Sequence, residues 1–320
     1  DSSAVPTISA LKTHYKDHIN PNLIMNGNFC SFERSNKEFF ILSNMSNASY
    51  LTDRWQVFSD VSDLEWSGGI TSFKPEKSLS VEKTGGTGNL TLCQFIENIA
   101  QFEPHEYVTV SFKAYSTNPK DIKVSIQPVF ERFARSLNEV SKPVYIVNDE
   151  GSYSVTLSIP PLGNLYRNDS DFDRSKYALV LKFDIGTALN ETFSIRDIKL
   201  EKGTKATKFV NYGGSEESDR QACLRYFERI RKRQHFSSYT KTDLGVYFVD
   251  VNFKVQKRFD VYRVDYDVVT ADGLQKGDVP NGIYPEAVAN VNRNKDGISF
   301  FTKIKNAPAH FENITIDADF

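Results

Sequence analysis

Three carboxylates stand at alternate positions of the segment NDSDFDRS, where Asp169, Asp171 and Asp173 could converge on one hard cation. Oxygen ligands of this kind suit Ca²⁺. The segment lacks the loop glycine and the twelfth-position glutamate of an EF-hand. Two interpretations therefore stay open, a structural calcium site and a plain acidic surface loop, and we expect no other cofactor.

Other candidate catalytic groups form no recognisable set. His14 and His18 are one helical turn apart and could share a metal ion, but neither has the adjacent glutamate that a hydrolytic zinc site uses as its base. No G-x-S-x-G segment occurs, and no cysteine and histidine form a known local signature. The sequence predicts a protein that is not an enzyme.

Aromatic residues in polar, turn-like surroundings are the remaining candidates for binding. The apolar face of a pyranose lies on a flat ring, so Tyr50, Trp66 and Tyr166 are predicted ligand contacts for a sugar. Trp55, inside the segment YLTDRWQVF, is predicted to lie in the core instead.

The overall charge excludes bulk electrostatic binding. The 320 residues include 39 basic and 41 acidic side chains, a net charge of −2, so neither nucleic acid nor an anionic membrane is an expected partner. No apolar run approaches membrane-spanning length, and we expect no membrane insertion. The chain begins with Asp rather than Met, which leaves room for an upstream segment.

The cysteine pattern predicts neither disulfides nor zinc. Cys30, Cys93 and Cys223 are odd in number and share no C-x-x-C spacing. We interpret them as small buried hydrophobic residues, which fits a protein made in a reducing cytoplasm.

Alternating apolar residues predict an all-β protein. In YVTVSFKAYS, residues 107–116, every second side chain is apolar, and YSVTLSI and YALVLKFDI follow the same period. Because these strands are not spaced by crossover helices, they predict an antiparallel jelly-roll β-sandwich over residues 22–212. A second, smaller β-sandwich is predicted over residues 237–320.

Two short segments break this β pattern. Residues 1–21 place Ile8, Leu11 and Tyr15 at heptad spacing, which predicts either a coiled-coil stub or a single capping helix. Residues 213–236 begin with glycines and acids and continue as an amphipathic pattern through Ala222, Tyr226 and Ile230. They predict a linker with a short helix between the two β domains.

The alternation slips by one residue within TFSIRDIKLEK, residues 192–202. Phe193 and Ile195 occupy one side of the two-residue period, whereas Ile198 and Leu200 occupy the other. We interpret the slip at Arg196 and Asp197 as a β-bulge, an added residue that returns the later pair to the face of the earlier one.

Four segments in order resemble the distal regions of bacteriophage tail fibre and receptor-binding proteins. They are NLIMNGNF (residues 22–29), YLTDRWQVF (50–58), FSIRDIKLEKGTKATKFVNY (193–212) and CLRYFERI (223–230). The resemblance spans about 190 residues through these motifs, and only the layout of the last 80 or so residues is similar. It implies a jelly roll similar to carbohydrate-binding modules, followed by a smaller β domain.

The resemblance also implies a function. A protein of this family is a virion component, made in the host cytoplasm, that attaches the phage to host envelope glycans and assembles as a homotrimer with other virion proteins. Two alternatives stay open: a structural fibre decorating the capsid or tail, and a polysaccharide depolymerase. The receptor and the host do not carry over from the resemblance.

Overall fold

A computed structural model describes the chain over residues 20–32, 39–42, 49–59, 65–73, 76–97, 99–130, 135–136, 138–161, 177–186, 188–230, 234–235, 246–254, 256, 263–270, 297–303 and 309–317. Its internal contacts divide the chain into two units. One comprises Asp1–Ser31 and Lys37–Asp219, and the other comprises Phe32–Asn36 and Arg220–Phe320. The predicted N-terminal helix or coiled-coil stub lies outside the described residues.

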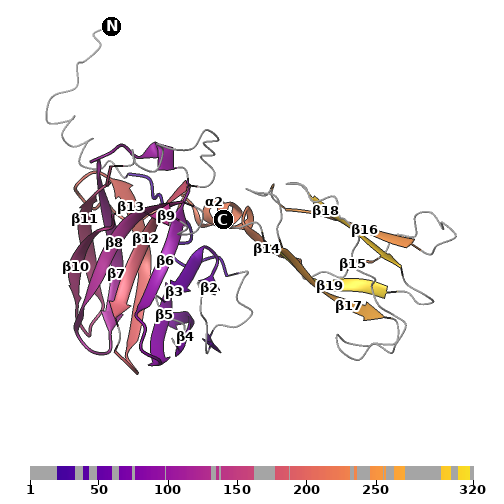
Figure 1. Cartoon of the computed structure of the whole chain (residues 1–320), viewed down its shortest axis with the longest axis horizontal. Coiled ribbons are helices and arrows are strands. Elements are labelled where there is room, and N and C mark those ends of the chain that lie inside the picture. The colour runs from indigo at the N-terminus through magenta and orange to yellow at the C-terminus, as the bar shows by residue number, and fades with distance from the viewer. Residues whose placement is uncertain are drawn as a thin grey trace, which may run out of the picture. The chain divides into compact units, whose positions relative to one another are not determined.

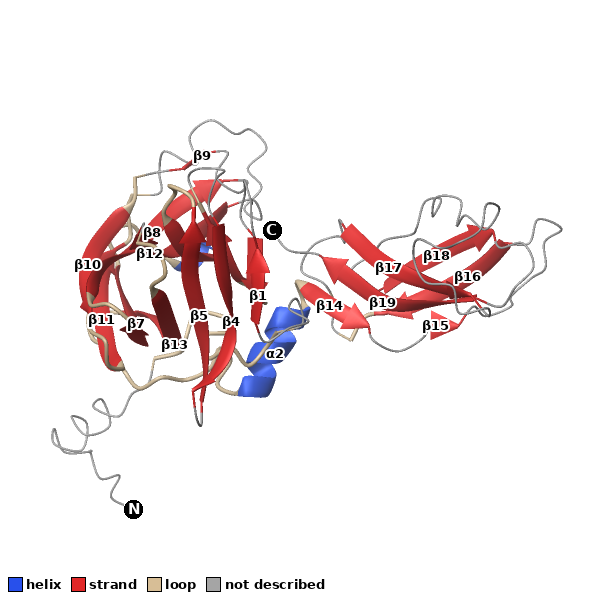
Figure 2. Ribbon diagram, turned by 90° about the horizontal axis from the view of Figure 1, so that it is seen from below, coloured by secondary structure: helices blue, strands red, loops and turns tan. Residues whose placement is uncertain are grey.

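The first unit consists of two antiparallel sheets (Figures 1 and 2). The six-stranded sheet has the spatial order β1 (Phe39–Leu42), β4 (Glu65–Phe73), β5 (Glu76–Gly85), β13 (Thr192–Lys202), β7 (Tyr107–Ser116) and β11 (Gly151–Ser158). The seven-stranded sheet has the order β10 (Val140–Ile146), β8 (Lys120–Phe130), β12 (Tyr177–Gly186), β6 (Leu90–Ile96), β3 (Trp55–Phe58) and β2 (Ser49–Thr52), with β9 (Arg135–Ser136) paired to β8.

Strands that follow one another along the chain often lie in opposite sheets. The connections β5 to β6, β7 to β8, β10 to β11 and β12 to β13 all cross from one sheet to the other. The inward side chains of both sheets form one core, in which Trp55 packs against Phe29 and Phe183 with ring centroids 6.0 and 6.2 Å apart. The predicted all-β jelly-roll sandwich and the core position of Trp55 are therefore confirmed.

The β-bulge in β13 is also confirmed. Arg196 pairs with Lys113 and Lys199 with Ser111, so three steps along β13 oppose two steps along β7. Asp197, inside the bulge, has a φ of 52°, a left-handed conformation that aspartate tolerates better than most residues. The extra residue keeps Phe193, Ile195, Ile198 and Leu200 in one core.

The bulge is held by the turn at Asn26 and Gly27. The amide of Ile198 donates to the carbonyl of Gly27 at 2.9 Å. A Cβ atom at Gly27 would lie 2.1 Å from the carbonyl oxygen of Ile198, so only glycine fits there. Asn22 donates to the Ile198 carbonyl at 3.0 Å and accepts from the amide of Leu200 at 3.1 Å. The first and third motifs of the sequence thus meet at the bulge.

Asn26 joins the second motif and helix α2 (Glu216–Leu224) to the same turn. Its side chain donates to the carbonyl of Asp53 at 2.9 Å, and its own carbonyl accepts from the indole of Trp55 at 3.0 Å. Its amide donates to the Asp219 carboxylate at 2.7 Å. Asp219 belongs to α2, which leads into the fourth motif. We call this set of contacts around Asn26 and Gly27 the hub.

The chain after α2 differs in part from the expected helix. The structure ends the helix at Leu224 and places Phe227–Ile230 in strand β14. The four-stranded sheet of the second unit joins β14, β15 (Gln234–His235) and β17 (Arg263–Thr270) to β19 (Ala309–Asp317). A two-stranded sheet pairs β16 (Val246–Asn252) with β18 (Gly297–Lys303). Within the described residues, no helix is long and apolar enough to cross a membrane.

Candidate functional site

A groove of about 810 Å³ lies along the outer face of the six-stranded sheet. Ser111 and Lys113 of β7 and Ser152 and Ser154 of β11 form its floor, because they alternate with side chains that enter the core. The complete lining is Asn28, Cys30, Lys77, Ser111, Phe112, Lys113, Ser152, Tyr153, Ser154, Asp197, Ala206, Thr207, Lys208, Phe209, Asn211 and Glu216. All of these residues belong to the first unit.

Residues 206–211 form one wall of the groove, and a buried polar network fixes them to β13. The side chains of Lys199 and Glu201 have no exposed surface, although they lie on the face of β13 that points away from the core. The Lys199 ammonium contacts Glu201 Oε2 at 3.3 Å and donates to Thr207 Oγ1 at 2.6 Å and to the carbonyl of Lys208 at 2.9 Å. All three ammonium protons therefore have acceptors.

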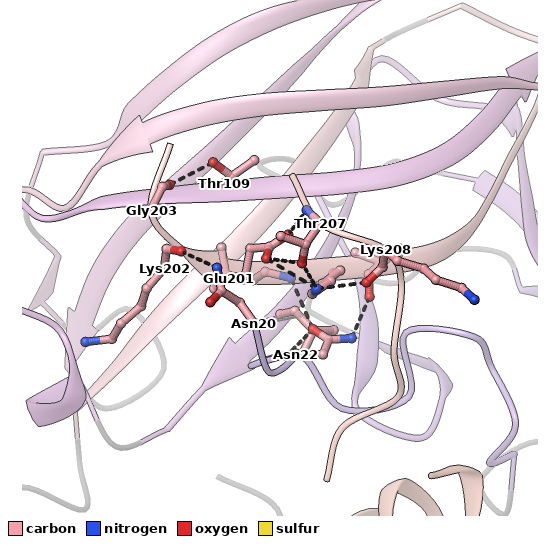
Figure 3. Close-up of polar contacts among 12 residues, drawn as sticks. Asn20, Asn22, Thr109, Glu201, Lys202, Gly203, Thr207 and Lys208 are labelled. Carbon is pink, nitrogen blue, oxygen red and sulfur yellow. Dashed lines mark hydrogen bonds and ion pairs between the residues drawn. The ribbon is translucent and has the colours of Figure 1, made fainter. Parts of the chain in front are cut away.

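Thr207 completes the network from the side of the wall (Figure 3). Its amide donates to Glu201 Oε1 at 2.7 Å, and its hydroxyl donates to Glu201 Oε2 at 2.6 Å. Thr109 donates to the carbonyl of Gly203 at 2.8 Å and so fixes the start of the wall segment. A buried ion pair with every hydrogen bond satisfied gives a rigid, uniquely placed wall.

The charges on the floor are partly neutralised at the bulge. Lys113 contacts Asp197 at 2.9 Å, and Arg196 contacts the same carboxylate at 3.4 Å. Arg196 also makes a bidentate pair with Glu150 at 2.6 and 2.7 Å. Lys208, in the wall, is exposed and its ammonium makes no ion pair within the described part of the chain. The groove therefore offers hydroxyls, amides and the charged side chains of Lys208, Lys77 and Glu216.

Phe209 supplies an aromatic ring beside these polar groups. It lies in the wall, lines the groove and is half-buried. A partly exposed ring next to hydroxyl and amide groups can accept the apolar face of a sugar while the polar side chains bind its hydroxyls.

Cys30 lines the groove but is not a nucleophile at neutral pH. Burial raises the pKa of its thiol to about 12, and the negative charges of Asp219 and Glu216 act in the same direction. The reactive form of cysteine is the thiolate, so the protonated thiol is chemically inert here. Cys30 is therefore not suited to act as a covalent nucleophile at neutral pH.

Comparisons with known proteins give structural neighbours only. No family model matches the sequence, and no curated protein matches it either. Similar solved structures include carbohydrate-binding modules. A CBM4 module is 16% identical over 56% of this chain and 98% of its own, with a TM-score of 0.33.

Two further structures show the same level of similarity. A family 11 carbohydrate-binding module from Clostridium thermocellum, in complex with a β-1,3-1,4-mixed-linked tetrasaccharide, is 16% identical over 54% of this chain and all of its own, with a TM-score of 0.33. The enzymatically active domain of bacteriophage CBA120 tailspike protein 4 is 13% identical over 57% of this chain and 21% of its own, also with a TM-score of 0.33.

Trp66 and Tyr50, the two predicted sugar contacts that the structure describes, are not among the residues that line the groove. Trp66 is 1% exposed and belongs to the core, so its ring has no open face for a ligand and this prediction is corrected. In β4, Trp66, Gly68 and Ile70 share the inward side, and the missing side chain of Gly68 disguised the alternation. Tyr50, on β2, is half-buried in the other sheet.

The remaining candidates lie outside the described residues. These are Tyr166 and the three carboxylates Asp169, Asp171 and Asp173 of the calcium prediction, which stays a prediction. Among the residues that the structure describes, no group of three or more His, Cys, Asp or Glu side chains is placed to hold a metal ion.

Sequence reasoning missed Phe209 and the floor of the groove. The floor combines strands β7 and β11, whose pairing is not visible in sequence. Residues 206–211, within the third motif, return over the outer face of β13, where Thr207 and Lys208 accept hydrogen bonds from Lys199. The one signal in the sequence for this site was Phe209, an aromatic residue between Lys208 and Asn211.

Proposed function

We propose that this chain is a bacteriophage virion protein, a tail fibre or receptor-binding protein, which attaches the phage to glycans of the host envelope without catalysing a reaction. It is made in the host cytoplasm and acts on the virion as a homotrimer. The groove on the six-stranded sheet is the glycan-binding site of this proposal.

The composition of the groove is the observation that carries the glycan proposal. Phe209 offers a ring for the apolar face of a sugar, and Ser111, Ser152, Ser154 and Asn211 offer hydroxyl and amide groups around it. The rigid wall holds these groups in place before the ligand arrives, which reduces the entropy lost on binding. An 810 Å³ groove has room for a short oligosaccharide.

The sequence resemblance supports the virion assignment. Three of the four ordered motifs that resemble phage fibres, residues 22–29, 50–58 and 193–212, are distant in sequence yet contribute to the hub around Asn26 and Gly27. Three segments that share one network behave as a single structural unit. Their joint occurrence therefore carries more weight than three separate weak matches.

Binding to an array of bacterial lipopolysaccharides and capsular polysaccharides tests the proposal. We expect the fluorescently labelled chain to bind a subset of these glycans. Phe209→Ala is expected to weaken that binding about tenfold, since loss of a stacking ring costs about 1–1.5 kcal/mol. Lys142→Ala provides a matched control, because Lys142 is exposed on β10 of the other sheet.

Four results would count against the proposal. Absence of binding to every glycan would contradict a glycan as the ligand. Unchanged binding by Phe209→Ala would contradict the groove as the binding site. Release of reducing sugar from a bound polysaccharide would show an enzyme instead. A monomer at all concentrations in mass photometry would contradict the homotrimer.

A further inference from the structure

The charged groups that line the groove do not cancel. They are three lysines and two carboxylates, namely Lys77, Lys113, Lys208, Asp197 and Glu216. Groups of opposite sign that lie close together present little net charge to a ligand, whereas a group without such a neighbour presents its full charge. The neighbours of each group therefore show where the excess positive charge lies.

The carboxylate of the floor is paired with cations. Asp197 is contacted by Lys113 at 2.9 Å and by Arg196 at 3.4 Å. Arg196 also makes a bidentate pair with Glu150. The two cations and the two carboxylates of this set balance, so the floor at the bulge contributes no excess charge.

Opposite charges also meet at the Cys30 end of the groove. Burial raises the pKa of the Cys30 thiol, the charges of Asp219 and Glu216 raise it further, and the charge of Lys77 lowers it. Lys77 and Glu216 thus act on the same thiol with opposite sign. Glu216 also accepts a hydrogen bond from the side-chain amide of Asn28 at 3.2 Å. Of the side chains that line this end, one is positive and one is negative.

Lys208 carries the remaining charge, and its backbone is fixed in place. Its carbonyl accepts from the Lys199 ammonium at 2.9 Å, whereas its own side chain is exposed and extends away from that buried network (Figure 3). Its ammonium makes no ion pair with any residue that the structure describes. The excess positive charge of the groove therefore lies on the wall, at a position that is set before a ligand binds.

Strand pairing places hydroxyl groups in line with this position. Lys199, which holds the Lys208 carbonyl, is the register partner of Ser111 on β7, and Ser111 is the partner of Ser154 on β11. Adjacent strands lie about 5 Å apart, so the two serines follow Lys199 in one row across the sheet. Neither serine hydroxyl makes a hydrogen bond within the described part of the chain. Both line the groove and are open to a ligand.

An ammonium beside hydroxyl donors suits an anionic group on a sugar. A negatively charged oxygen accepts stronger hydrogen bonds than a neutral hydroxyl does, and a charged donor strengthens them further. Lys208 supplies the charged donor, and Ser111 and Ser154 supply neutral ones. Phe209, the next residue of the wall, supplies the ring on which the sugar packs. The carboxylate of an acidic sugar and a phosphate carried by a sugar share this chemistry.

We propose that the groove selects acidic glycans, whose carboxylate or phosphate group lies against Lys208 and the hydroxyls of Ser111 and Ser154. The inference rests on the proposed function, because it names the class of glycan that the same groove binds. Since the Lys208 side chain is exposed, water and salt weaken its contact with an anion. The contact therefore discriminates between glycans more than it adds to the total affinity.

Chemically matched polysaccharides test the proposal. Labelled chain is applied to an array of purified bacterial lipopolysaccharides and capsular polysaccharides, and each one that binds is tested again in two modified forms. Carbodiimide activation followed by borohydride reduction converts sugar carboxylates to primary hydroxyls, and aqueous hydrofluoric acid removes phosphate groups. We expect one of the two treatments to weaken binding to each of these polysaccharides at least about tenfold. The treatment that does so identifies carboxylate or phosphate as the anionic group.

Three variants test the assignment to Lys208. Lys208→Gln should bind the untreated polysaccharides about fivefold more weakly than wild type, and Lys208→Arg, which keeps the charge, should bind within about twofold of wild type. The difference between wild type and Lys208→Gln should disappear on the polysaccharide that has lost its anionic group. Lys205→Gln is the matched control, because Lys205 is an exposed lysine of the same segment that does not line the groove. It should bind as wild type does.

The outcomes separate this inference from the proposed function. Neutral polysaccharides bound as tightly as acidic ones, binding that survives both treatments, or equal binding by wild type and Lys208→Gln would overturn the inference and leave the glycan function standing. Equal losses in Lys208→Gln and Lys205→Gln would show a general attraction to basic residues, which also overturns it. Absence of binding to every polysaccharide would overturn both.

Discussion

Replacement of Asp219 by asparagine is expected to change how the stability of the first unit depends on pH. Asp219 is completely buried, and its carboxylate accepts a hydrogen bond from the amide of Asn26 in the hub at 2.7 Å. Burial raises the pKa of this carboxyl from 3.8 to about 7, and the nearby Glu216 acts in the same direction, whereas the amides of Asn26 and Tyr212 act in the opposite direction. The carboxyl is therefore protonated in the folded chain under mildly acidic conditions.

The sign follows from the higher pKa of the folded state. The folded state binds the Asp219 proton more tightly than the unfolded state does, and this stabilises the fold. The stabilisation is complete below pH 3.8, falls as pH rises, and is gone above about pH 7. Between about pH 5 and pH 7 the loss amounts to roughly 2 kcal/mol, because the slope of about 1.36 kcal/mol per pH unit falls by half at the pKa of the folded state. The amide that replaces the carboxyl in Asp219→Asn does not titrate, so the variant lacks this loss.

Urea denaturation at about pH 5 and about pH 8 measures the effect. The free energy of unfolding of Asp219→Asn relative to wild type should rise by roughly 3 kcal/mol from the lower to the higher pH. Any fixed effect of the amide cancels in this difference, because it is the same at both pH values. A difference that stays constant within about 0.5 kcal/mol would refute the reasoning, since Asp219 would then ionise at the same pH in both states.

Three more predictions concern the bulge, the wall and the thiol. Gly27→Ala should lower the free energy of unfolding by about 2–3 kcal/mol, because its Cβ would clash with the Ile198 carbonyl 2.1 Å away. Thermal or urea melts measure this, and an unchanged midpoint would contradict it. Thr207→Val should cost about 2 kcal/mol by leaving Lys199 and Glu201 without its hydroxyl, whereas Thr207→Ser keeps that hydroxyl and should melt close to wild type. Cys30 should react with iodoacetamide much more slowly than free cysteine at neutral pH, because its pKa is about 12, and mass spectrometry of the alkylated peptide would show otherwise if the thiol were reactive.

The parts of the fold that follow from local periodicity could be predicted from the sequence. The slip at Arg196 and Asp197 located the bulge in β13. Side chains alternate between the two faces of a strand, so apolar residues that change phase can reach the same core only if one residue is added or lost between them. The same periodicity was less informative in β4, where Gly68 left a gap between Trp66 and Ile70 and the indole was assigned to the surface. A single missing side chain was enough to hide a core position.

The groove could not be predicted because it depends on contacts between distant segments. Period-two alternation places Lys199 and Glu201 on the outer face of β13, where they would be expected to contact water. They are buried because residues 206–211 fold back over them, and no local pattern predicts that return. Phe209 and the serines of β11 are brought together by that return and by the pairing of β11 with β7.

The hub at Asn26 and Gly27 has a consequence for how such chains diversify. It joins the beginning of the first unit, strand β3, the bulge of β13 and the first turn of α2, while the loops at 86–89 and 147–150 contribute no contact to it. Changes of length or composition in those loops leave this junction intact. The first unit is therefore a framework that can accept new loops at one end without a change in the contacts that hold its strands together.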